Sequence, residues 1–135
     1  MIAAALLASA AFFLECEVTE PPETARRFTA EQAWDAGHLS LVMPPPTVWM
    51  VDQDKGRVVA LNDGRAGMIY RMPPPPVGYP DDAIIADWIS AGFVRSGLRL
   101  DGDRLEVAYA NPDKDAGIPE VWSWYMRCIR TTLPD

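Results

Sequence analysis

The stretches FFLECEVT (residues 12–19) and VWSWYMRCIRT (residues 121–131) decide the fold, because each alternates apolar and polar side chains as a half-buried strand does. In the first stretch, the apolar face consists of Phe12, Leu14, Cys16 and Val18. In the second stretch, it consists of Trp122, Trp124, Met126 and Cys128. Each cysteine therefore lies on the apolar face of its own predicted strand.

The two cysteines lie near opposite ends of the chain, and they would meet if the first and last strands were neighbours or faced each other across a core. The sequence therefore predicts a Cys16–Cys128 disulfide. Glu15 and Glu17 would then share the outer face with Arg127, which is a favourable arrangement of opposite charges. The alternative is two separate buried thiols, since cysteine is among the most buried residue types. Two cysteines and one histidine fall short of the ligand set that zinc requires.

The first eleven residues bear on the redox state of these cysteines. Residues 2–7 form a short apolar core, and residues 8–11 (ASAA) place small side chains where signal peptidases cut. We predict that residues 1–11 are a signal peptide and that residues 12–135 form a single domain, periplasmic or secreted. No basic residue precedes the apolar core, which is atypical of such a leader. The alternative is a buried first strand or a frayed start, and the many alanines argue against a strand.

The middle of the chain is divided by turn signals at short intervals. Residues 47–52 and 57–62 flank Asp54-Lys55-Gly56, and residues 98–100 and 104–110 flank Asp101-Gly102-Asp103, so each pair predicts a hairpin. Residues 38–43 and 66–72 also alternate as strands do. With the two terminal strands the total is about eight or nine. This predicts a mainly β protein, either a small antiparallel β-barrel or a β-sandwich.

Two segments are compatible with more than one structure. Residues 26–37 carry a capping-box pattern, Thr29 with Gln32, which suits a short helix. They also alternate, and we favour a hairpin leading into residues 38–43. Residues 81–91 predict the one short helix, because an acidic pair comes first, Gly92 follows, and an apolar stripe lies between them. That stripe consists of Ile84, Ile85, Trp88 and Ile89.

Composition and charge argue against several classes of partner. The chain has 135 residues, is 49% hydrophobic and carries a net charge of −7, with 12 basic against 19 acidic residues. Nucleic acids and anionic membrane surfaces both require clustered cations, and the nearest approach to such a cluster is the pair Arg26 and Arg27. No stretch is apolar over the roughly 18 residues that a membrane span needs. We therefore expect no nucleic-acid partner and no membrane span.

Aromatic residues offer the best candidates for a ligand site. Tryptophan and methionine side chains line pockets in ligand-binding barrels, although filling a core is their commoner use. The candidate ligand-binding residues are Trp49, Trp122, Trp124 and Met126. His38, the single histidine, follows a turn, and we expect it to be a solvated surface group rather than a catalytic one.

Two loops repeat the pattern Asp-x-Asp-x-Gly, which raises the question of a calcium site. Their candidate metal ligands are Asp52, Asp54, Asp113 and Asp115. An EF-hand places its glycine one position later and has no lysine beside the carboxylates, and Asp and Gly are the ordinary residues of turns. We favour turns without metal, with a weak calcium site as the alternative, and expect no cofactor.

No catalytic motif is recognisable, so function is inferred from class alone. The sequence favours an exported, non-catalytic binding or accessory module that takes a small apolar ligand in a site lined by Trp and Met. One alternative is a protein-binding or inhibitory module that uses exposed loops such as residues 73–80. A hydrolase without a recognisable motif is the least favoured alternative.

Overall fold

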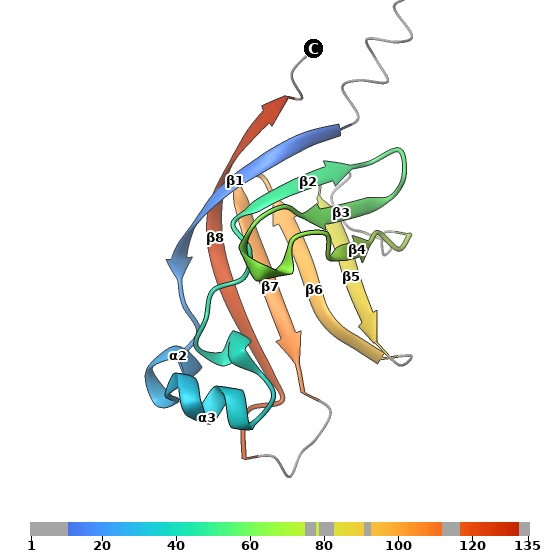
Figure 1. Ribbon diagram of the computed structural model, residues 1–135. Helices are drawn as coiled ribbons and strands as arrows, with labels where there is room; N and C mark the ends of the chain where they lie inside the picture. The colour runs from blue at the N-terminus through green and yellow to red at the C-terminus, as the bar shows by residue number, and fades with distance from the viewer. Residues whose placement is uncertain (1–10, 75–77, 79–82, 91–92, 112–116, 133–135) are drawn as a thin grey trace, which may run out of the picture.

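The computed structural model describes residues 11–74, 78, 83–90, 93–111 and 117–132. These residues form eight strands that pair in chain order, each antiparallel to the next, and the last strand pairs with the first to close a barrel (Figure 1). The strands are β1 (Ala11–Glu20), β2 (Val48–Asp52), β3 (Arg57–Ala60), β4 (Ile69–Arg71), β5 (Ile84–Ser90), β6 (Phe93–Asp101), β7 (Arg104–Ala110) and β8 (Val121–Thr132). The predicted mainly β fold is confirmed, and of its two forms it is the barrel.

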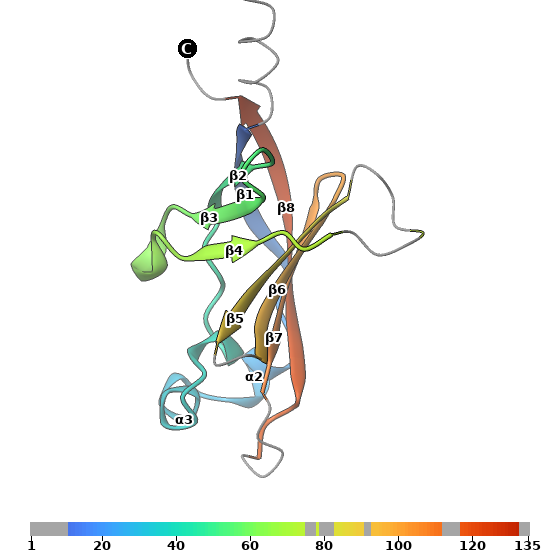
Figure 2. The same ribbon diagram turned by 90° about the vertical axis from the view of Figure 1, so that its right-hand side faces the viewer.

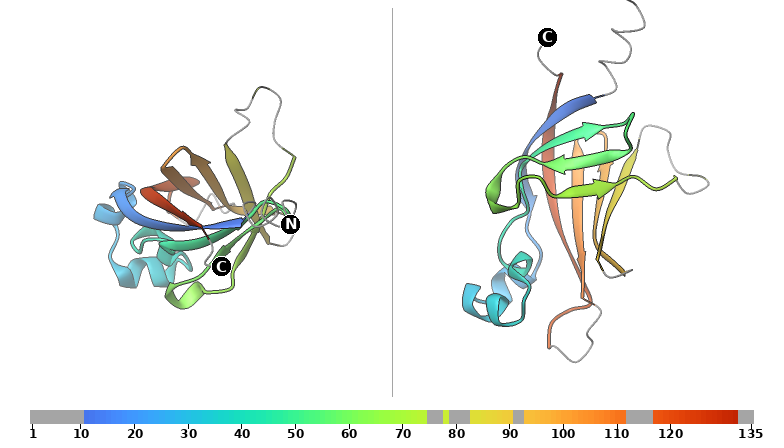
Figure 3. Two further views of the ribbon diagram at one scale, coloured as in Figure 1. Left: turned by 90° about the horizontal axis from the view of Figure 1, so that it is seen from above. Right: turned by 45° about the vertical axis from the view of Figure 1, so that its right-hand side comes forward.

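The two ends of the barrel differ. Strand β1 begins and β8 ends at one end, which faces the viewer on the left of Figure 3. The opposite end carries two short helices, α2 (Thr24–Arg27) and α3 (Ala30–Asp35), and the 3-10 turn η1 (Leu39–Leu41). A second 3-10 turn, η2 (Asp63–Arg65), joins β3 to β4. The short strands β2, β3 and β4 cross β5, β6 and β7 steeply (Figure 2).

The inner faces of the strands fill the barrel with apolar side chains. Fully buried members of this core include Leu14, Trp49, Val51, Tyr70, Leu100, Leu105, Val107 and Met126. A second buried cluster lies under the helices and consists of Ala33, Leu41, Trp122 and Trp124. Strand β8 therefore contributes to both clusters, because its inward residues run from the barrel interior to the helical end. The predicted inward faces of β1 and β8 are confirmed.

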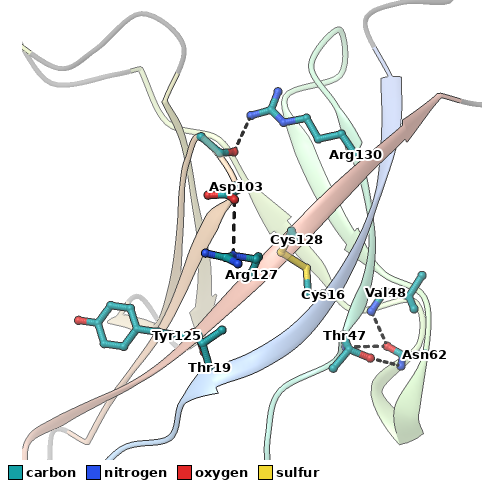
Figure 4. The surroundings of a disulfide bond; sticks show 11 residues. Cys16, Thr19, Thr47, Val48, Asn62, Asp103, Tyr125, Arg127, Cys128 and Arg130 are labelled. Atoms are coloured by element: carbon teal, nitrogen blue, oxygen red, sulfur yellow. Dashed lines mark hydrogen bonds and ion pairs between the residues drawn. A yellow bond between two sulfur atoms is a disulfide. The ribbon is translucent and has the colours of Figure 1, made fainter.

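The pair Cys16 and Cys128 lies where β1 meets β8, and the predicted disulfide is confirmed (Figure 4). The Cys16 N–H donates to the Thr47 carbonyl at 2.8 Å, and the Cys128 N–H donates to the Asp103 carbonyl at 2.7 Å. Both amides thus point away from the β1–β8 seam. Opposed residues in such a non-hydrogen-bonded pair bring their side chains closest together, and here the two Cα atoms are 4.0 Å apart.

The outer face at this seam also follows the sequence. Glu17 lies opposite Arg127 in the register, as expected from the alternation. The Arg127 Nε atom lies 3.6 Å from a carboxylate oxygen of Asp103 in the β6–β7 turn (Figure 4). Both side chains are largely exposed, so this ion pair contributes little to stability.

Residues 44–46, a run of three prolines, form a connector between η1 and β2. Pro45 and Pro46 are fully buried. At the start of β2, the Asn62 side-chain oxygen accepts the N–H groups of Thr47 and Val48 at 2.9 and 3.0 Å (Figure 4). One amide side chain thereby joins the start of β2 to the end of β3.

The predicted helix over residues 81–91 is wrong, because Ile84–Ser90 is strand β5. Ile84 and Ala86 are buried in the barrel, and β5 pairs with β6 along its whole length. The four residues of the expected helical stripe do not form one buried face, since Ile89 is 58% exposed. Ile84, Ala86 and Trp88 alternate along the segment, which also suits a strand. The hydrogen bonds that make it a strand come from pairing with β6, and a local sequence pattern cannot reveal such long-range pairing.

The favoured hairpin over residues 26–43 is also wrong. The alternative is correct over residues 30–35: the Thr29 hydroxyl accepts the Gln32 N–H, the Gln32 side chain accepts the Thr29 N–H, and α3 follows. Within the expected strand at residues 38–43, Leu39–Leu41 is the 3-10 turn η1. A complete capping box outweighed the weak alternation that favoured a strand.

Three observations relate to the predicted leader, to membrane spans and to the redox compartment. Residues 1–10, most of the predicted signal peptide, lie outside the described residues, and Ala11 is the first residue of β1. Among the helices in the described part of the chain, none is long and apolar enough to span a bilayer. The disulfide is consistent with an oxidising compartment.

Removing the disulfide tests its contribution to stability. Replacing both Cys16 and Cys128 by alanine should lower the free energy of unfolding by about 2–4 kcal/mol. The bond links two residues 112 positions apart and so reduces the conformational freedom of the unfolded chain. Guanidinium unfolding followed by tryptophan fluorescence measures this. Adding a thiol reductant should lower the unfolding midpoint of the wild type and leave the midpoint of the double variant unchanged. Equal midpoints for the oxidised wild type and the double variant would contradict the prediction.

Candidate functional site

A cavity of about 530 Å³ lies at the helical end of the barrel. Its lining comes from α3, the turn after it, η1, η2 and the adjacent ends of β5, β6 and β7. Cavities that hold small molecules measure roughly 300–1,000 Å³. The cavity is therefore large enough for a small organic molecule.

The walls of the cavity are mainly apolar. The largest apolar side chains among them are Trp34, Leu39, Met68 and Trp88. Trp34 is 69% exposed although it lies on the short helix α3, and Trp88 is partly buried against the barrel core. A large exposed aromatic side chain at the edge of an apolar cavity is the arrangement expected of a binding surface.

Helix α3 is held in place by contacts beneath it. Ala33 and Leu41 pack on Trp122 and Trp124, and the Trp124 indole N–H donates to the Ser40 carbonyl at 2.7 Å. The helix ends as Gly37 adopts a φ of 77°, a conformation that favours glycine. This turn places His38, Leu39 and Ser40 along one side of the cavity.

His38 is partly buried in the cavity wall, which corrects the expectation of a solvated surface group. Its ring lies edge-on to Trp122, with the ring centres 5.5 Å apart. Burial and, secondly, the positive charge of Arg95 lower the pKa of His38 below its ordinary value, against an opposing hydrogen bond with the Asn111 side chain. The imidazole is therefore mainly neutral at pH 7.

Arg95 reaches the cavity because of an irregularity in β6. Trp88 pairs with Ser96 and Ile89 pairs with Val94, so Arg95 is an extra residue with no partner across the β5–β6 ladder. Strict alternation would place Arg95 on the outer face, since Ser96 is buried inside. A bulge changes the direction of the side chain, and both Arg95 and Ser96 line the cavity.

Arg65 lines the cavity from η2, but its charge already has partners. Its Nη2 atom donates to the Asp63 carboxylate at 2.9 Å and to the Pro44 carbonyl at 2.7 Å. Its Nη1 atom donates to the Tyr109 hydroxyl at 3.4 Å. Burial is the main reason that the pKa of Tyr109 is raised, so this phenol stays protonated. Arg65 thus joins the β3–β4 loop to β7 and to the proline connector.

A buried hydrogen bond separates the cavity from the barrel core. The hydroxyl groups of Ser96 and Tyr70 lie 2.9 Å apart, and Tyr70 packs edge-on against Trp49. Among the large side chains of the apolar core lies a void of about 10 Å³. The cavity therefore ends where the large side chains of the core begin.

The four residues predicted to bind a ligand do not line this cavity. Trp49 and Met126 are fully buried in the barrel core, whereas Trp122 and Trp124 belong to the cluster under the helices. Trp122 comes nearest, because it contacts two cavity residues, His38 edge-on and Tyr109 by stacking. The structure brings the four together only as two pairs, and a ligand role for them stays a prediction.

Of the candidate metal ligands, Asp52 and Asp54 lie at the turn between β2 and β3. Asp52 ends β2, and its carboxylate accepts the Lys55 N–H at 3.2 Å, which is the turn role considered above. Asp113 and Asp115 lie outside the described residues. Within the described ranges no group of three or more His, Cys, Asp or Glu side chains could hold a metal ion.

Sequence reasoning missed most of the cavity residues, for reasons that differ. Tyr109 can be identified from the alternation of its strand, because it lies on the same inward face as Leu105 and Val107. Trp88 was assigned to a helix instead of to the inward face of β5. Arg95 gave no signal, since the bulge that turns it inward depends on the register between two strands.

Comparisons with protein family models, with curated proteins and with solved structures find no match to this chain.

The electrostatic coupling between Arg95 and His38 can be measured directly. Replacing Arg95 by glutamine should raise the pKa of His38 towards its ordinary 6.5, because a nearby positive charge is removed. The chain has one histidine, so a proton NMR titration of its ring is unambiguous. In the wild type, a lowered pKa means that the stability contributed by neutral His38 is present above pH 6.5 and lost as pH falls through the folded-state value.

Arg99 supplies the matched control, because it is exposed on the same strand and its replacement removes the same charge. Arg99→Gln should leave the His38 titration close to that of the wild type. Equal shifts in the two variants would contradict a local interaction.

Proposed function

We propose that this protein binds a small, largely apolar organic molecule in the cavity beside α3, and that it does so outside the cytoplasm. The observation that carries the proposal is the exposed Trp34 at the edge of a cavity of about 530 Å³ whose walls also include Trp88 and Met68. The disulfide supports the extracytoplasmic location, since such bonds persist in oxidising compartments.

The energetic argument rests on apolar surface. Each square ångström of apolar surface removed from water contributes about 25 cal/mol, and aromatic side chains offer much of it at little cost in side-chain entropy. Trp34 does not support the fold by burial, because 69% of it remains exposed. A ligand lying against Trp34 and Trp88 would cover this surface. Ligand binding is therefore the role that best accounts for Trp34.

The alternative of a protein-binding module rests on residues 73–80. Of these, residues 75–77 and 79–80 lie outside the described residues. We therefore advance the small-molecule proposal alone.

A neutral fluorescent probe tests the proposal. N-phenyl-1-naphthylamine is apolar, uncharged and bright only when shielded from water, so its fluorescence should rise on mixing with the protein. Trp34→Ala should weaken the affinity of the protein for the probe about fivefold, which corresponds to a loss of roughly 1 kcal/mol of binding free energy. Thermal unfolding should change little, because Trp34 is mostly exposed.

Ile129→Ala is the matched control. Ile129 is 66% exposed on β8 and borders a separate hollow beside Cys16. The Ile129→Ala variant therefore tests whether the probe binds in that hollow instead of in the cavity beside α3. We expect this variant to bind the probe as the wild type does. The proposal fails if the probe does not bind, or if Trp34→Ala binds it no more weakly than Ile129→Ala.

A further inference from the structure

We propose that the ligand of this cavity is an organic anion, a molecule with an apolar body and one carboxylate or sulfonate group that pairs with Arg95. This inference rests on the proposed function, because it specifies the chemistry of a ligand in the same site. It begins with the bulge in β6, which aims a guanidinium group into a mainly apolar cavity.

The hydrogen bonding of Arg95 is incomplete. Among the described residues, four side chains have a buried nitrogen without a hydrogen-bond partner, and Arg95, through its Nε atom, is the one that lines the cavity. A buried donor of this kind is costly when unpaired, and more so when the group is charged. An anion in the cavity would pair with the charge of Arg95, because the guanidinium presents its N–H donors in a planar fork that fits a carboxylate or a sulfonate.

The other charges around the cavity leave Arg95 as the cation available to a ligand. Arg65 is held by the Asp63 carboxylate, the Pro44 carbonyl and the Tyr109 hydroxyl. His38, whose pKa is lowered by burial and by the charge of Arg95, is mainly neutral at pH 7. None of the described residues that line the cavity is acidic. In a chain of net charge −7 the described lining of the cavity is thus positively charged, which favours an anion and disfavours a cation.

The apolar walls determine the rest of the ligand. Arg95 comes from the strand that pairs with β5, next to the position where Trp88 faces Ser96. An anionic group at Arg95 would therefore lie near Trp88, and the body of the molecule would cover apolar side chains of the same cavity, Trp34 among them. An aromatic or fatty acid has this combination of one charged end and an apolar body.

Two dyes that differ by one charged group test the inference. 8-Anilinonaphthalene-1-sulfonate carries a sulfonate that N-phenyl-1-naphthylamine lacks, and the two are otherwise identical. Arg95→Gln should weaken the affinity for the sulfonate about tenfold or more, as expected for a charge-assisted hydrogen bond. It should leave the affinity for the neutral dye within about twofold of the wild type. Arg99→Gln, which removes an exposed charge from the same strand, should change neither affinity.

A second measurement needs no variant and remains decisive if Arg95→Gln does not fold. Dodecanoate and dodecanol have the same chain length and differ in charge, and each can displace N-phenyl-1-naphthylamine from the wild-type protein. Dodecanoate should displace the dye at a concentration at least about fivefold lower. Equal displacement by the acid and the alcohol would overturn the inference.

The outcomes separate this inference from the proposed function. If the neutral dye binds and Trp34→Ala weakens it, but Arg95→Gln lowers both affinities equally or neither, the apolar site stands and the anion assignment is overturned. If neither dye binds the wild-type protein, the site itself is wrong. If Arg95→Gln weakens binding of the sulfonate dye and leaves binding of the neutral dye unchanged, the inference is supported, whether the natural ligand is a fatty acid or an aromatic acid.

Discussion

The structure depends on the pairing of β1 with β8. A sheet that stays open exposes two edges of unpaired backbone groups, and closing it satisfies both at once. Here the closure joins segments from opposite ends of the chain, which is the contact with the highest entropic cost to form. The disulfide lies on this seam, at the pair where the two side chains are closest, so it reinforces the contact that defines the barrel.

Closure also decides where empty space remains. Large apolar side chains fill the barrel up to the hydrogen bond between Tyr70 and Ser96, and beyond it the walls come from strand ends, turns and α3. Turns and strand ends cannot interdigitate as the faces of paired strands do, and a cavity results. The same cluster of Trp122 and Trp124 that holds α3 in place supports His38 at the cavity wall, so the packing of the helices and the shape of the site have a common origin.

The bulge in β6 gives the cavity its charge. A regular strand would have placed Arg95 among the exposed residues of the outer face, where a guanidinium is well solvated. One extra residue places it inside beside Trp88, where its electrostatic interactions are stronger because less water screens them. An irregularity that costs one ladder position therefore places a positive charge in the wall of a mainly apolar cavity, and the proposed anion binding rests on this charge.

The sequence by itself determined the terminal strands, their inward faces, the disulfide and the hairpins around Gly56 and Gly102, because alternation and turn chemistry act over a few neighbouring residues. It predicted correctly that Leu14 and Met126 face inward, but alternation cannot distinguish a packed interior from one that surrounds a cavity. Only the tertiary structure decided that residues 84–90 form a strand and that Arg95 turns inward. Both outcomes depend on the register between β5 and β6, and register is a property of two paired segments that neither segment carries alone.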